Sequence, residues 1–180
     1  MLEIVIHGGE FFDDGSGRFI QVKDQTLKLE HSLVSLSKWE AKWHKAFLSR
    51  EAKTVEESVD YIRCMTITQN VNPDVYLAVT PQILKEVSAY IDASMTATTF
   101  PPDSKGRGSR EIITAEIIYY WMICENIPFE CQKWHLSRLL TLINVCRVKN
   151  APQKKMSRKE IMTRNRALNA ARRKKFNTRG

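Results

Sequence analysis

Positive charge is concentrated at one end of this chain, and that separation constrains how the chain can fold. Of its 180 residues, the last 31, from Asn150 to Gly180, contain eleven Lys and Arg but a single Glu. The first 149 residues contain seventeen Lys and Arg against nineteen Asp and Glu. A nearly neutral, apolar segment can fold around its own core, whereas a strongly basic segment is suited to an acidic partner. We therefore expect one globular domain over residues 1–149, a linker over 150–156 and a basic C-terminal helix or tail over 157–180.

The first 30 residues have the composition of short β-strands. Leu2–Ile6, Phe19–Val22 and Thr26–Leu29 are β-prone, and Asp13–Gly17 is a dense turn signal between the first two. The same turn does not fit a calcium-binding loop, because Arg18 occupies the position that requires glycine. These residues predict a small antiparallel hairpin or meander.

From Ser32 onward the apolar residues recur every three or four positions, which indicates helices over residues 31–149. The first predicted helix carries an aromatic and aliphatic stripe made of Leu33, Leu36, Trp39, Trp43 and Phe47. At this spacing the stripe is typical of a side packed into a core. The alternative is an aromatic platform that stacks on a base or another ligand.

Further helix starts are marked by residues that cap a helix or suit its first turn. Thr54 to Glu57 forms a capping box, and Asn72-Pro73 and Thr80-Pro81 each place a capping side chain before a proline. The last of these helices is predicted to run to about Asp92.

Glu111–Cys124 is apolar on nearly every face, which predicts a central helix surrounded by the others. Glu116 lies within it and could be an acid or base, but no second carboxylate or histidine stands at a suitable spacing. Phe129 to about Val148 predicts one more helix. The expected fold is α+β and predominantly α: an N-terminal hairpin or meander, a bundle of about five to six helices, and a basic C-terminal helix.

No motif in the sequence indicates an enzyme, a metal site or a cofactor. The four cysteines form no Cys-x-x-Cys pair and predict buried free thiols, and the four histidines lack metal-ligand spacing. The N-terminus does not resemble a secretory signal, and the apolar run over residues 112–124 is too short to cross a bilayer. We expect a non-enzymatic protein that contacts no membrane.

The segment from Thr99 to Arg110 breaks the helical pattern. It contains two prolines and two glycines together with three cations, Lys105, Arg107 and Arg110. It fits neither a phosphate-binding P-loop nor a dinucleotide-binding turn. It is either a mobile loop between helices or a contact for an anion or a partner.

The basic tail contains a second capping box, Ser157 to Glu160, which predicts a helix from Arg158 to about Lys175. A helix with so few large apolar residues is marginal in water, because packing normally supplies most helical stability. We expect it to dock weakly on the domain or to gain full order from a partner. The candidate partner-binding residues are Lys154, Lys155, Arg158, Ile161, Met162, Arg164, Arg166, Leu168, Arg172, Arg173, Lys174 and Lys175.

Several segments resemble proteins that tailed bacteriophages encode among their tail morphogenesis genes, in the position of tail assembly chaperones. The resembling residues are 29–40, 61–66, 95–98, 113–120, 127–135, 154–158 and 166–173. The resemblance implies a non-enzymatic protein of the bacterial host cytoplasm that binds the tape-measure protein and keeps it soluble until the tail tube assembles. Chaperones of this kind often also have a frameshifted long form, and the sequence shows no frameshift site.

Two other functions remain open from the residues. The basic tail could bind nucleic acid without sequence preference, because its cations can neutralise phosphates. The chain could also be a structural neck or tail component of the virion.

Overall fold

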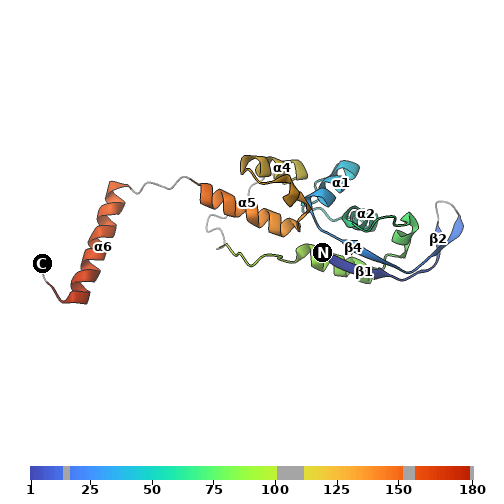
Figure 1. Cartoon of the computed structure of the whole chain (residues 1–180), viewed down its shortest axis with the longest axis horizontal. Coiled ribbons are helices and arrows are strands. Elements are labelled where there is room, and N and C mark those ends of the chain that lie inside the picture. The colour runs from blue at the N-terminus through green and yellow to red at the C-terminus, as the bar shows by residue number, and fades with distance from the viewer. Residues whose placement is uncertain (14–16, 101–111, 152–156, 179–180) are drawn as a thin grey trace. The chain divides into compact units, whose positions relative to one another are not determined.

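The computed structural model describes residues 1–13, 17–100, 112–151 and 157–178, and it has the predicted α+β, mostly helical fold (Figure 1). The chain divides into two compact units, Met1–Val148 and Lys149–Gly180. The strands are β1 (Leu2–Ile6), β2 (Gly9–Asp13), β3 (Arg18–Val22) and β4 (Gln25–Leu29). The helices are α1 (Leu33–Trp43), α2 (Val55–Met65), the 3-10 helix η1 (Pro73–Ala78), α3 (Pro81–Asp92), α4 (Ala115–Cys124), the 3-10 helix η2 (Phe129–Lys133), α5 (Leu136–Asn150) and α6 (Arg158–Phe176).

The four strands form two antiparallel pairs, β1 with β4 and β2 with β3, and β2 was missed in the sequence. Leu2 faces Leu29 in the first pair and Gly9 faces Val22 in the second, so the register is unchanged from one pair to the other. The strands are thus the two halves of one long hairpin. Of the predicted turn at its tip, residues 14–16 lie outside the described residues.

The hairpin is interrupted at Gly8, where the two arms approach very closely. A β-carbon on Gly8 would lie 2.3 Å from the carbonyl oxygen of Val22, so only glycine fits there. The Gly8 amide donates a hydrogen bond to Oδ1 of Asp24 at 2.7 Å, and this bond lowers the pKa of the Asp24 carboxyl. The side chain of Asp24 thus takes the place of a backbone acceptor between the two arms of the hairpin at Gly8.

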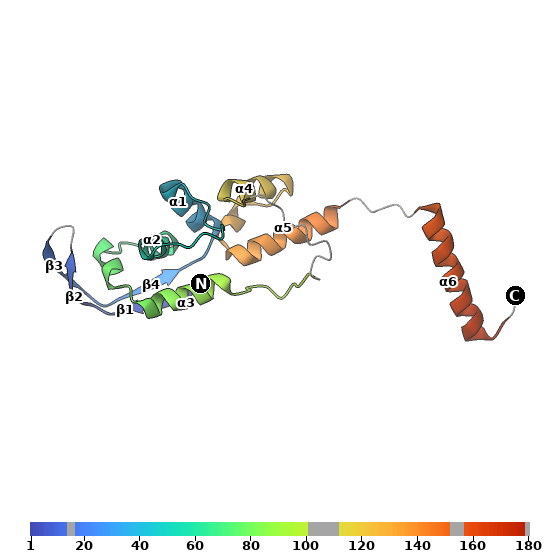
Figure 2. The ribbon, with the colours of Figure 1, turned by 180° about the vertical axis from the view of Figure 1, so that it is seen from behind.

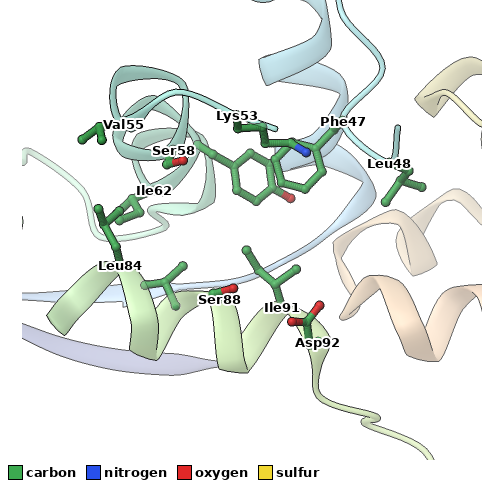
Figure 3. A pocket seen from close by; sticks show the side chains of 12 residues that line it. Phe47, Leu48, Lys53, Val55, Ser58, Ile62, Leu84, Ser88, Ile91 and Asp92 are labelled. Carbon is green, nitrogen blue, oxygen red and sulfur yellow. The ribbon is translucent and has the colours of Figure 1, made fainter. Parts of the chain in front are cut away.

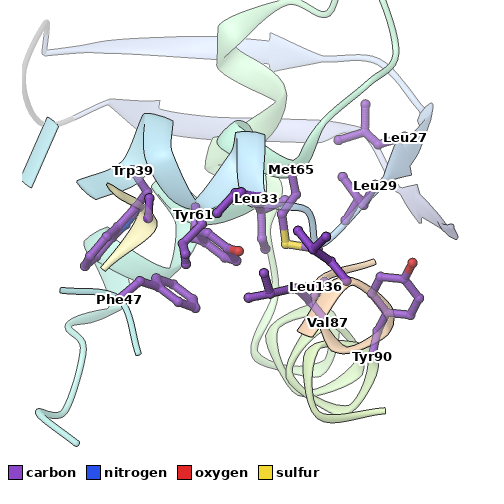
Figure 4. Close-up of a cluster of buried hydrophobic side chains, with 14 of the residues drawn as sticks. Leu27, Leu29, Leu33, Trp39, Phe47, Tyr61, Met65, Val87, Tyr90 and Leu136 are labelled. Atoms are coloured by element: carbon purple, nitrogen blue, oxygen red, sulfur yellow. The ribbon is translucent and has the colours of Figure 1, made fainter. Parts of the chain in front are cut away.

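The aromatic stripe near the start of the helical region belongs to the core. Helix α1 ends at Trp43 because His44 adopts a left-handed conformation, with φ 53°, so Phe47 lies beyond the helix and not on its face as predicted. Phe47 nevertheless stacks on Tyr61 with ring centroids 3.8 Å apart (Figure 4). Trp39 donates a hydrogen bond from Nε1 to the carbonyl of Glu57. Trp39 and Phe47 are buried, so the structure does not support a ligand-stacking platform.

The helix starts lie where the capping residues predicted them. Thr54 and Glu57 form a reciprocal capping box at α2, and Asn72 and Thr80 each accept a hydrogen bond from the first turn that follows. Helix α3 ends at Asp92, as expected. These local signals are reliable here because each cap satisfies backbone amides that the helix itself leaves unpaired.

Helix α4 is not the surrounded central helix that its composition predicted. It begins at Ala115, buries Ile118 and Met122 against the rest of the domain, and leaves Tyr120 and Ile123 about as exposed as surface residues, at 63% and 60%. Glu116 is exposed as well. A helix that is apolar all round gives no indication of which side is covered, so the sequence could not reveal this surface position. Figure 2 shows α4 from behind the view of Figure 1.

The predicted helix from Phe129 to Val148 is in fact two helices. The 3-10 helix η2 ends at Lys133, and α5 begins only at Leu136. Trp134 and His135 separate them in extended backbone, where Ser32 and His135 form an isolated β-bridge. Long-range pairing, which no local pattern announces, therefore breaks the helix.

The buried carboxylate of Glu40 connects three segments that are distant in the sequence. One oxygen of Glu40, in α1, accepts the amide of Phe47 at 2.8 Å, and the other accepts the amide of Ala115 at 2.7 Å. The residue before α4, Thr114, makes no side-chain cap of its own. Glu40 thus caps α4 from another helix, and its negative charge sits favourably at a helix N-terminus.

Replacing Glu40 by alanine should therefore destabilise the fold strongly. Two buried amides would lose their acceptor, and each unsatisfied group costs about 1–3 kcal/mol, which gives a loss of about 2–6 kcal/mol. Urea unfolding followed by circular dichroism measures this. Glu40→Gln, which keeps one carbonyl oxygen, should lose less, and Glu56→Ala on the exposed side of α2 should change stability by no more than about 0.5 kcal/mol.

A second buried polar cluster lies where β4, α2, α3 and α5 meet. The Nδ1 of His31 is 2.6 Å from the hydroxyl of Tyr61, and the His31 carbonyl accepts the amide of Leu136 at 2.7 Å. His135 lies with its ring centroid 5.2 Å from that of His31 and donates from Nε2 to the carbonyl of Tyr90. Burial lowers the pKa of His31 to about 4, the second cause being its neighbour His135, and burial also lowers the pKa of His135.

Stability should therefore fall on acidification. Below pH 6.5 the unfolded chain protonates His31 while the folded chain keeps it neutral down to about pH 4, so the unfolded state gains protons first. At about 1.4 kcal/mol for each pH unit, the loss from this residue is roughly 3 kcal/mol, and His135 acts in the same direction. Urea unfolding at intervals from pH 7.5 to 4.5 tests this.

In that titration His31→Gln should flatten the pH dependence, whereas the exposed His44→Gln should leave it as it is. A free energy of unfolding that stays constant between pH 7 and 5 would contradict this account of the histidine pair.

Candidate partner-binding surfaces

Helix α6 presents every one of its side chains to solvent. None of its residues is buried, and its four large apolar residues are 45–68% exposed. These four are Ile161, Met162, Leu168 and Phe176. Ile161 and Leu168 are seven residues apart, two turns along the same side, while Ala167 and Ala170 lie on other sides of the helix. The helix thus carries a narrow apolar stripe with nothing in its own unit to cover it.

The ends of α6 are well capped, which explains why so polar a segment is helical. Ser157 and Glu160 form the predicted reciprocal capping box, with the Ser157 amide 2.8 Å from the Glu160 carboxylate. This amide lowers the pKa of Glu160. At the other end Asn177 adopts a left-handed conformation, and Arg173, Lys174 and Lys175 stand where a helix dipole favours cations.

The charge of α6 is strongly one-signed. The helix contains eight cationic residues and a single carboxylate, that of Glu160. The cationic residues are Arg158, Lys159, Arg164, Arg166, Arg172, Arg173, Lys174 and Lys175. The predicted contact residues Lys154 and Lys155 lie outside the described residues, as do the loop cations Lys105, Arg107 and Arg110. The structure therefore brings the predicted apolar and cationic residues from Arg158 to Lys175 together on one exposed helix.

A second surface, which the sequence did not reveal, is a groove between α2 and α3. Its volume is about 400 Å³, within the range of sites that hold a ligand or a partner side chain. Its walls are largely apolar and come from three segments: Phe47, Leu48, Lys53, Val55, Ser58, Tyr61 and Ile62 on one side, and Leu84, Val87, Ser88, Ile91 and Asp92 on α3 (Figure 3). The apolar periodicity of the sequence predicts the helices here, but it does not show that the apolar sides of α2 and α3 leave a space between them.

Lys53 is the cation of this α2–α3 groove. Its ammonium lies 4.5 Å from the centre of the Phe47 ring, and burial lowers its pKa despite the raising effects of Glu57 and Glu51. Glu57 itself is paired with Lys45 and with the amide of Thr54. Within the described part of the chain, neither Lys53 nor Asp92 forms an ion pair.

Metal-binding groups and reactive thiols were also sought among the described residues. No group of three or more His, Cys, Asp or Glu among them could hold a metal ion. The cysteines are free, and burial raises the pKa of Cys64 to about 11 and that of Cys131 above its usual range, which disfavours a reactive thiolate. No helix in the described ranges combines the length and apolar character needed to cross a membrane.

Comparisons with protein-family models, with curated proteins and with solved structures found no match to this chain. An exposed basic helix with an apolar stripe and an open apolar groove are both suited to binding other molecules by surface burial and charge.

Proposed function

We propose that this chain is a non-enzymatic morphogenesis protein of tailed bacteriophages, a tail assembly chaperone that keeps the tape-measure protein soluble in the host cytoplasm. The observation that carries the proposal is α6, a capped helix whose four large apolar side chains are all exposed. The resemblance of segments such as 29–40, 113–120 and 166–173 to tail assembly chaperones supplies the phage context.

The proposed mechanism is masking of apolar surface on the client. The stripe of Ile161 and Leu168 would pack along an apolar stripe of a client helix, while the surrounding cations pair with its acidic residues. A helix that is marginal alone gains order from such packing, so binding and ordering of α6 are coupled. Covering the client in this way prevents it from aggregating until tube subunits replace the chaperone.

Co-expression of the full chain with the tape-measure protein of the same phage should move that protein into the soluble fraction. The double substitution Ile161→Asp with Leu168→Asp should reduce co-purification at least about tenfold, because burial of each side chain contributes about 1.5–3 kcal/mol. Ala167→Asp with Ala170→Asp makes the same charge change on other sides of α6 and serves as the matched control. An unchanged pellet, with no co-purification by the unsubstituted chain, would count decisively against the proposal.

The one-signed charge of α6 favours a second candidate function, binding of nucleic acid without sequence preference. Eight cations along one exposed helix can displace counterions from several phosphates. The helix offers no aromatic residue except Phe176 for stacking on bases, so such binding would depend on charge alone.

If this second function holds, affinity for a random DNA duplex should fall about a thousandfold between 50 and 200 mM salt. Changing Arg172, Arg173, Lys174 and Lys175 to glutamine should reduce binding and flatten the salt dependence in fluorescence anisotropy titrations. The control variant changes four exposed lysines of the domain to glutamine and should keep both the binding and its salt dependence. These lysines are Lys23, Lys38, Lys85 and Lys133. Weak binding that is insensitive to salt would eliminate this candidate.

A further inference from the structure

The α2–α3 groove remains open although apolar side chains form both of its walls. Val55 at one end of the groove is 70% exposed and Leu48 at the other end is 38% exposed, whereas Val87 at its base is buried. In Figure 3, the residues from Leu84 to Asp92 follow α3 along one wall, and Phe47 and Lys53 lie across from them. The open stretch extends over two turns of α3, about the length over which one helix packs on another.

The two walls of this groove carry opposite charges. Lys53 stands on the wall before α2, and Asp92 stands at the end of α3 on the other wall. In the described part of the chain neither has an ion-pair partner, although the nearby Glu57 is held by Lys45. An occupant that covers the apolar surface and also carries one acidic and one basic group would pair with the charges of both walls.

We propose that the α2–α3 groove binds one helix of the client protein, which inserts a large apolar side chain between an acidic residue directed to Lys53 and a basic residue directed to Asp92. This inference rests on the proposed function and adds a second client contact on the folded domain. An aliphatic acid or amine would bring one charge to a groove that presents two. A helix carries apolar and oppositely charged side chains three or four residues apart, which matches the arrangement of the walls.

The main test variant fills the groove with a new side chain at an exposed position of α3. Ser88 lines the groove and is exposed, so Ser88→Trp places a large ring in the space where the client side chain would lie. Ala89→Trp, one residue further along α3 and outside the groove lining, is the matched control. Lys53→Glu tests the charge contact, with Lys85→Glu on the exposed side of α3 as its control.

The measurement is capture of the co-expressed tape-measure protein by each full-length variant, with thermal unfolding to verify that each variant is folded. We expect Ser88→Trp and Lys53→Glu to lower capture at least about tenfold and both controls to stay within about twofold of the unsubstituted chain. Capture by Ser88→Trp that equals that of the unsubstituted chain would overturn the groove proposal.

These outcomes separate the two proposals. If Ile161→Asp with Leu168→Asp abolishes capture while Ser88→Trp leaves it intact, the chaperone function stands and the groove is not the second contact. If the unsubstituted chain captures no tape-measure protein, the function fails and the groove proposal fails with it.

Discussion

The N-terminal domain depends on one charged side chain, the carboxylate of Glu40. Its two oxygens accept the amides of Phe47 and Ala115, so a single residue of α1 fixes both the segment that follows α1 and the start of α4. The position of Phe47 in turn places its ring on Tyr61, and Tyr61 reaches His31 through its hydroxyl. Core packing in this domain is therefore directed by a few buried polar contacts, each of which satisfies groups that burial would otherwise leave unpaired.

The two partner-binding surfaces differ in how they are held. The α2–α3 groove is built on packed helices, with Val87 and Ile62 buried at its base, so its shape exists before a partner arrives. Helix α6 has no buried residue, and a capping residue stands at each of its ends. A preformed groove gives up little conformational entropy on binding, whereas an uncovered helix gives up more but can adapt its position to the partner.

Local signals in the sequence were sufficient for the helix starts that a capping residue marks, but not for the start of α5 or for the surfaces. Thr54, Thr80 and Ser157 cap the helices that they predicted, because capping involves residues within one turn. The side of α4 that is exposed, the strand β2 and the α2–α3 groove depend on which distant segments meet. The near-uniform apolar composition of α4 contains no such information, and β2 is concealed because Gly8 precedes it and Gly9 is its first residue.

The break at Gly8 divides the N-terminal hairpin into an inner half, whose Ile4, Ile6, Leu27 and Leu29 belong to the core, and an outer half formed by β2 and β3. Because one register runs through both halves, residues added to or removed from the outer tip in matched pairs, one from each arm, would leave the inner pairing unchanged. Val22, at the end of β3 next to the break, also belongs to the core, so it is the tip of the outer half that evolution can lengthen or shorten without disturbing the core.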